Sequence, residues 1–232
     1  MLAETRDAPQ ASDLVYKFKA SPYSSHGLLM ATLPQDGAGK SLLDVGCGDG
    51  YLSKILAERG YKVTGLEKRG GYSDRFPASV RLIVADLEGG LPPLGESYDY
   101  VMCADILEHL RRPEDLLLQL RRVLKPGGTL IASLPNSGNF YFRLNILLGR
   151  FPKADEGLFD RTHVRFYMWD GWRALIQGAG FHITSVRPTS IPFELVIGQS
   201  TPVHAAERVY YELARLWKAL LAYQFVLTAV PE

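Results

Sequence analysis

The sequence is poor in cysteine: Cys47 and Cys103 are its only two among 232 residues. Both lie in stretches that a strand would bury, so we expect reduced structural thiols, as in a cytoplasmic protein, and no disulfide scaffold. No uncharged apolar run reaches the ~18 residues of a membrane span, although 213–230, interrupted by Arg215 and Lys218, comes near. The first ten residues show no basic-then-apolar pattern of a secretion signal.

The sequence also lacks an excess of charge of either sign. Lys and Arg number 26 against 25 Asp and Glu, a net charge of +1, so no overall field would gather nucleic acid or an anionic membrane. A hydrophobic content of 47% suits one α/β domain. We predict a single domain over 1–232, with an N-terminal cap at 1–38, a substrate lid at 136–169 and a helical extension at 188–221.

One glycine-rich stretch, LLDVGCGDG at 42–50, organises the rest of the chain. An apolar strand leads into glycines 46, 48 and 50, and a segment with helical spacing follows. Such glycines allow positive φ and let a ligand approach the backbone, while the helix start offers free N–H groups. A dinucleotide fingerprint requires glycine at its sixth position, which Tyr51 occupies here, so an NAD-dependent oxidoreductase is a distant alternative.

The spacing Asp-x-Gly-x-Gly-x-Gly at 44–50 resembles the first motif of class I S-adenosylmethionine (SAM)-dependent methyltransferases. A glycine turn that only joins a strand to a helix is the structural alternative. The resemblance implies that SAM is the cofactor. It assigns cofactor binding to the residues of the motif: Asp44, Gly46, Cys47, Gly48, Asp49 and Gly50.

An acidic residue, Glu67, ends the predicted second strand at 61–66, about 20 residues after the glycine turn. At that distance a carboxylate is well placed to accept both ribose hydroxyls of an adenosyl group. We place the adjacent Lys68 beside the cofactor as well. The alternative is a surface glutamate that pairs with Lys68.

The predicted third strand, 80–85, ends at Asp86 and Leu87. The resemblance makes Asp86 the acceptor for the adenine amino group and puts Leu87 beside the ring. The alternative is an aspartate that caps the turn before two glycines.

The fourth strand, 98–104, continues into DILEHL. In the family, this strand tip lines the methionine half of SAM, so Ala104 and Asp105 are predicted pocket-wall positions. His109 follows in the same motif, where a structural histidine is at least as common as a catalytic base.

Strands alternate with helical patterns along most of the chain. Further strands are predicted at 129–134, 181–186 and 223–230, with a helix before the first of them. This alternation, together with the resemblance, predicts an α/β fold: a Rossmann-like, seven-stranded, mostly parallel sheet with helices on both faces, its last strand antiparallel, a lid insertion after the fifth strand and a helical extension between the sixth and seventh.

The lid segment is rich in aromatic and basic residues. It carries five basic and four acidic residues between positions 136 and 170, a balance that argues against a nucleic-acid groove. We expect a lid helix at 140–148. The stretch 158–169 resembles a methyltransferase subgroup that includes the methionine-biosynthesis W proteins and ubiquinone-type enzymes. There, His163 and Asp160 are the best base candidates; a salt-bridged hinge is the alternative.

For two further predicted helices, the sequence does not decide what their side chains contact. A pre-sheet helix begins near His26, for which a partly exposed position is favoured over one facing the site. The extension places an apolar stripe, Leu213, Leu216 and Trp217 among it, that we expect to pack on the domain. A homodimer face or a shallow membrane contact are the alternatives, the membrane being the less favoured.

These observations predict a SAM-dependent methyltransferase (EC 2.1.1.-) that acts on a small molecule, most readily on a hydroxyl of a sugar or natural-product intermediate. Methyl transfer from a sulfonium needs alignment, exclusion of water and a base for a hydroxyl acceptor, so no metal is expected. The alternative is a methyltransferase-like regulatory subunit that binds SAM and another protein.

Overall fold

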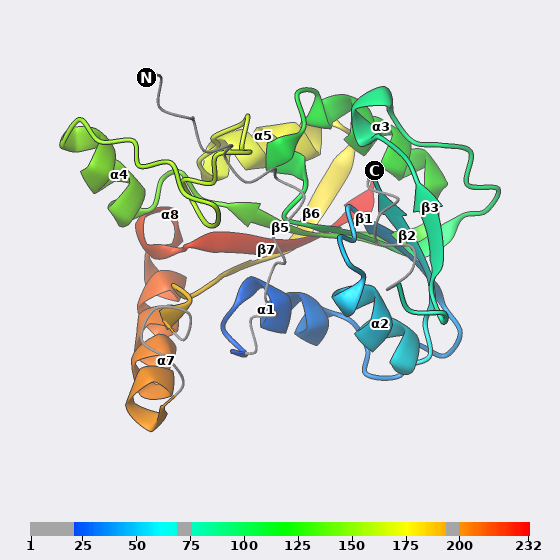
Figure 1. Cartoon of the computed structure of the whole chain (residues 1–232), viewed down its shortest axis with the longest axis horizontal. Helices are drawn as coiled ribbons and strands as arrows, with labels where there is room; N and C mark the ends of the chain where they lie inside the picture. The colour runs from blue at the N-terminus through cyan, green and yellow to red at the C-terminus, as the bar shows by residue number, and fades with distance from the viewer. Residues whose placement is uncertain (1–20, 69–75, 194–199) are drawn as a thin grey trace, which may run out of the picture.

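The computed structural model describes residues 21–68, 76–193 and 200–232, and shows a seven-stranded sheet with helices on both sides (Figure 1). The start of the predicted cap and residues 194–199 of the predicted extension lie outside the described residues. The strands are β1 Ser41–Val45, β2 Lys62–Glu67, β3 Arg81–Val84, β4 Tyr98–Ala104, β5 Leu124–Pro135, β6 Phe181–Pro188 and β7 Gln224–Pro231.

The strand order is β3-β2-β1-β4-β5-β7-β6. The pairs from β3 to β5 are parallel, whereas β7 is antiparallel to both of its neighbours, β5 and β6. The predicted fold class is therefore confirmed. The order reverses between β1 and β4, which is the point where open α/β sheets bind ligands at the carboxyl ends of their strands.

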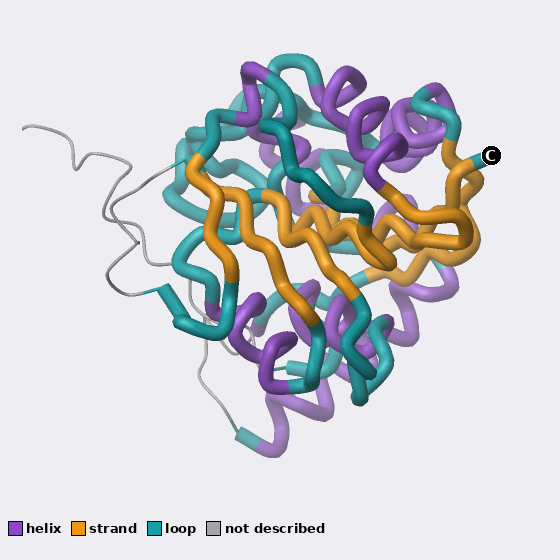
Figure 2. Tube along the Cα trace, turned by 90° about the vertical axis from the view of Figure 1, so that its right-hand side faces the viewer, coloured by secondary structure: helices purple, strands orange, loops and turns teal. Residues whose placement is uncertain are grey.

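Helices cover the two faces of the sheet, whose strands run side by side between them in Figure 2. The α-helices are α1 Ser25–Thr32, α2 Tyr51–Glu58, α3 Pro113–Val123, α4 Phe140–Leu147, α5 Trp169–Gly178, α7 Thr201–Leu216 and α8 Lys218–Leu221, and the short 3₁₀ helices are η3 Leu87–Gly89 and η4 Leu107–His109. No helix among the described residues combines the length and apolar character that crossing a membrane requires.

The apolar core has two halves, one on each face of the sheet. Adjacent residues of β1 show the division: Leu42 packs with Leu29 of α1 and Leu56 of α2, while Leu43 packs with Leu117 of α3. Successive side chains of a strand point to opposite faces, so a strand buried on both sides is apolar at every position. This explains the continuous apolar run that opens the glycine-rich stretch.

The helices beyond β5 are less covered. α4 forms where the lid helix was expected, but Leu147 at its end is 82% exposed. In α7, Leu216 is 86% and the following Trp217 62% exposed, so the expected packing of the apolar stripe on the domain is wrong for these residues, whereas Tyr210 of the same stripe is half-buried. The chain breaks at Trp217, which ends α7 and precedes α8, and the stripe therefore does not run along one continuous helix.

Candidate active site

The glycine turn lies at the carboxyl end of β1. Gly46, Gly48 and Gly50 have φ values of +73°, +56° and +78°, a region that L-residues with side chains rarely adopt. A Cβ on Gly46 would also lie 2.7 Å from the Ile106 side chain, whereas nothing lies within 4 Å of a Cβ on Gly48. Gly46 thus serves packing, and Gly48 leaves its backbone open to a ligand.

The Glu67 carboxylate, at the end of β2, lies against this turn. Its Oε2 accepts a hydrogen bond from the Gly48 amide at 3.0 Å. This contact holds the carboxylate at the edge of the turn, next to the open backbone of Gly48. The position fits a ribose-binding carboxylate, as the spacing predicts.

The Lys68 ammonium lies 2.8 Å from a carboxylate oxygen of Asp86. Asp86 also accepts a hydrogen bond from the Glu88 amide at 3.1 Å, so it caps the short helix η3, as its structural alternative predicts. The hydrogen bond from Lys68, followed by that from Glu88, holds the pKa of Asp86 below its usual range. Both charged groups are at the surface, while Leu87 beside them is buried.

Asp44 lies beneath the turn and is only 1% exposed. The Ser53 hydroxyl of α2 donates to it at 2.6 Å. Burial raises the pKa of Asp44 to about 7, the Ser53 hydrogen bond opposes the rise, and the Glu67 charge adds to it. The two thiols, Cys47 and Cys103, are free and buried, and burial raises the pKa of each.

Asp105 follows Ala104 at the end of β4 and has a φ of +52°. Its amide donates to the Ser133 hydroxyl at 3.0 Å, and its Oδ1 accepts from Ser133 at 2.5 Å and from the Gln224 amide group at 2.9 Å. Contacts from β5 and β7 therefore hold an aspartate in a left-handed conformation that costs free energy. Sequence reasoning missed Ser133 and Gln224.

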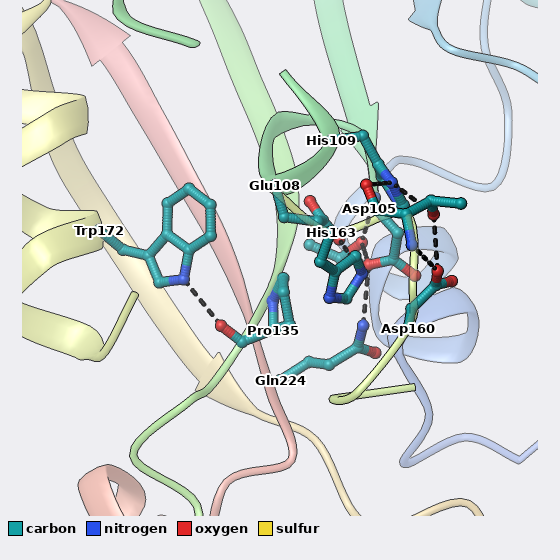
Figure 3. A network of polar contacts seen from close by, with 10 residues as sticks. Asp105, Glu108, His109, Pro135, Asp160, His163, Trp172 and Gln224 are labelled. Carbon is teal, nitrogen blue, oxygen red and sulfur yellow. Dashed lines mark hydrogen bonds and ion pairs between the residues drawn. The ribbon is translucent and has the colours of Figure 1, made fainter. Parts of the chain in front are cut away.

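Two histidines and a glutamate come together next to Asp105 (Figure 3). The rings of His109 and His163 meet edge to face with centroids 4.7 Å apart, and His163 Nε2 lies 3.8 Å from Glu108 Oε1. The amides of Val164 and Arg165 both donate to the Glu108 carbonyl and fix this part of the lid segment to η4. The structure thus brings together the two histidines that the sequence proposed separately.

Asp160 reaches His109 through Thr162. Its Oδ1 accepts from the Thr162 amide at 2.7 Å and from the Thr162 hydroxyl at 2.6 Å. His109 Nδ1 lies 3.0 Å from that hydroxyl oxygen and 3.3 Å from the Thr162 carbonyl oxygen. Because the hydroxyl hydrogen goes to Asp160, both Thr162 oxygens accept from Nδ1–H, and the lone pair of His109 is on Nε2.

His163 is in a more enclosed setting. Burial, followed by the neighbouring His109, lowers the pKa of His163 to about 4, against opposing effects of Asp160 and Asp105. Its imidazole is therefore neutral near pH 7 and a weaker base than an ordinary histidine.

A second histidine contact was not expected. His26 of α1 is 5% exposed, and its Nε2 lies 2.7 Å from the Tyr51 hydroxyl. The favoured, partly exposed position of His26 is therefore wrong. Tyr51 is the first residue of α2, directly after the glycine turn. One hint of a special role for Tyr51 was present in the sequence, namely that it occupies a position where a dinucleotide site has glycine.

The sheet order, the glycine turn and the carboxylate at the end of β2 define a class I methyltransferase, the group of enzymes that uses SAM as methyl donor. A family model described as a methyltransferase domain matches residues 22–186, and the chain belongs to this family. SAM, and not NAD, is therefore the cofactor. The residues present fit it, because the Gly48 backbone is open and Glu67 lies beside it.

Curated relatives include ubiquinone biosynthesis O-methyltransferases. The protein of Pseudomonas entomophila is 32% identical over 123 residues, which cover 47% of this chain and 50% of the relative. The protein of Azoarcus sp. is 35% identical over 121 residues, covering 48% and 51%. The chain spans about half the length of these two relatives.

Solved structures share the fold. A SAM-dependent methyltransferase from Archaeoglobus fulgidus has a TM-score of 0.61 at 19% identity, covering 88% of this chain and 91% of that one. The magnesium protoporphyrin IX methyltransferase from Synechocystis, with bound S-adenosylhomocysteine (SAH), has a TM-score of 0.58 at 20% identity, covering 89% and 80%.

Proposed function

We propose that this chain transfers the methyl group of SAM to a hydroxyl of a small molecule. The observation that carries the proposal is the chain of contacts from Asp160 through Thr162 to His109, which leaves an imidazole lone pair at the tip of β4. The curated O-methyltransferases support a hydroxyl acceptor. A sugar or natural-product intermediate is the acceptor class first suggested by the sequence.

The cofactor residues take the roles that their positions suggest. Glu67 binds the ribose hydroxyls, Asp86 accepts from the adenine amino group and Leu87 packs on the ring. Ala104 and Asp105 line the methionine half. The remaining residues of the proposed cofactor site belong to the turn or its rim: Asp44, Gly46, Cys47, Gly48, Asp49, Gly50 and Lys68.

The bound cofactor supplies an electrophilic methyl group for in-line displacement. The protein has to align the acceptor, exclude water and receive a proton. In this proposal His109 Nε2 activates the hydroxyl, Thr162 fixes the ring through Nδ1, and Asp160 stabilises the positive charge that the ring acquires. His163 is a weaker base and holds the His109 ring edge to face.

The direct test starts with calorimetric titration of the purified chain with SAH, beside NAD. SAM turnover is then measured with sugars, phenols and quinols as acceptors. We expect SAH binding, and SAH production with one hydroxyl class. A His109→Gln change should lower kcat by 100-fold or more, within the range of general-base catalysis, with SAH affinity unchanged. The exposed His182 provides a matched control, His182→Gln, which should retain full activity.

Two outcomes would contradict the proposal. SAH binding without turnover on any acceptor, together with stoichiometric co-purification of one protein, would instead favour a regulatory subunit. Equal kcat values for the wild type and His109→Gln would remove His109 from the chemistry while leaving the methyltransferase assignment intact.

A further inference from the structure

We propose that Glu108, His109 and His163 form a binding site for one divalent transition-metal ion of the zinc type. One potential ligand atom from each residue lies within 4.8 Å of the others. Metal binding itself does not depend on the proposed function. Only its role toward the acceptor, described below, rests on that function.

The spacing of the ligand atoms is close to what a metal requires. Two nitrogen or oxygen ligands at ~2.0–2.1 Å from a tetrahedral zinc ion are about 3.3 Å apart. Glu108 Oε1 and His163 Nε2 are 3.8 Å apart, so this pair needs a shift of about 0.5 Å. The ligand atoms of all three residues lie within 4.8 Å of one another, so binding an ion requires shifts of at most about 1.5 Å, which rotations of the side chains supply.

The contacts around His109 are those of a metal-binding histidine. Such a residue usually donates its other ring N–H to a carbonyl or carboxylate, which fixes the tautomer and the ring direction. His109 Nδ1 is directed to the two oxygens of Thr162, and Thr162 is held in turn by Asp160. Nε2 is therefore the nitrogen that remains for a ligand bond.

The charge of the surroundings also favours a cation. The Glu108 carboxylate is 1% exposed, and the Asp160 carboxylate, which reaches His109 through Thr162, is 3% exposed. Carboxylates gathered in a poorly hydrated region repel one another, and a bound cation relieves that repulsion. Glu108 and His109 are held in η4 while His163 is in the lid segment, so the ion would join two separate parts of the chain.

Two histidines and one carboxylate leave coordination positions open, as in catalytic metal sites. If the acceptor binds beside Asp105, its hydroxyl oxygen can occupy such a position. Coordination lowers the pKa of the hydroxyl, so that its proton passes to solvent. The oxygen then forms the new O–C bond while the C–S bond of SAM breaks, giving the methyl ether and SAH. With the ion bound, the lone pair of His109 Nε2 is a ligand, so His109 acts through the ion and is not itself the base that receives the proton.

The test uses untagged, full-length protein that has been treated with a chelator and dialysed. It is titrated with Zn²⁺ by calorimetry and with Co²⁺ by visible absorption, which reports the ligand geometry. We expect one ion per chain. The variants Glu108→Gln and His163→Gln should each weaken binding at least 100-fold, and Thr162→Val should weaken it 10–100-fold, as for other residues that support a ligand.

His182→Gln serves as the matched control and should bind the metal as the wild type does. Circular dichroism and SAH titration of every variant separate loss of the site from loss of the fold. A wild type that binds no ion, or binds it no more tightly than a folded His109→Gln/His163→Gln variant, overturns the proposal. If SAH binding and turnover persist without metal in the same samples, the proposed function stands and the ion has no role in the reaction.

Discussion

The carboxyl ends of β1 to β4 and the helices beyond β5 differ in what fixes their residues. At the strand ends, short turns bring Gly48, Glu67 and Asp105 to one edge through backbone and side-chain hydrogen bonds. Beyond β5, Leu147 and Leu216 keep most of their surface exposed. Residue spacing predicts the first region well because each of these residues lies at or just after the end of a strand of the sheet. In the second region, amphipathic spacing does not identify the surface that would cover the apolar face.

The sharpest test of this difference substitutes a glycine in each region. Gly46→Val combines a left-handed backbone with a clash against Ile106, so we expect it to lower stability by about 2–5 kcal/mol and to abolish SAH binding. Gly149, just after α4, also has a positive φ, but a Cβ added there would meet nothing within 4 Å. Gly149→Ala should cost only about 1 kcal/mol, with SAH binding retained.

Urea unfolding and SAH calorimetry on both variants provide the measurement. Similar losses in the two variants would mean that the turn at the end of β1 is no more constrained than the end of α4.

The strand ends should also give stability a pH dependence. The pKa of Asp44 is raised to about 7 from an ordinary value near 4, so the folded state holds its proton more tightly than the unfolded chain does. The stability from this group is present in full below about pH 4 and is lost as the pH rises to about 7, by at most about 4 kcal/mol.

Asp44→Asn should flatten that slope while keeping an acceptor for Ser53. Urea unfolding at several pH values between about 4 and 7.5 measures it. A wild-type slope equal to that of the variant would show that Asp44 titrates normally despite its burial.

A substitution of Glu67 tests whether the strand ends, and not the helices beyond β5, bind the cofactor. Glu67→Gln should weaken SAH binding by about 1–3 kcal/mol, because charge-assisted hydrogen bonds to the ribose are lost. Glu212→Gln, an exposed glutamate of α7 paired with Arg215, is the control and should leave SAH affinity unchanged. Calorimetry on both proteins measures the SAH affinity. An unchanged affinity for Glu67→Gln would show that Glu67 does not bind the ribose and serves only its structural contact with Gly48.

The smallest effects are expected on the helices beyond β5. Leu147→Ser and Leu216→Ser should change stability by less than about 0.5 kcal/mol, because these side chains bury little surface. Leu43→Ala in β1 should cost about 2–5 kcal/mol in the same urea experiment. A loss of more than about 2 kcal/mol for either surface variant would show that the exposed side chain is covered in solution.

The sequence predicts the fold class because strands, glycine turns and helices alternate along most of it, and each leaves a local pattern. It also predicts that the glycine turn and Glu67 meet, since both follow neighbouring strands. It does not predict the exposure of Trp217, because helical periodicity shows which residues share a face of a helix but not what that face packs against. Nor does it predict that His26 is buried against Tyr51, a contact between residues of two separate helices.

By itself, the amino-acid sequence determined the sheet, the turn for the cofactor and the class of chemistry, all of which depend on local spacing. Only the tertiary structure decided which side chains meet at the tip of β4. The lid segment folds back onto η4, so that Thr162 contacts His109 and His163 approaches Glu108. These residues are far apart in the chain, and packing of the lid segment against the tip of β4 brings them within reach of one another.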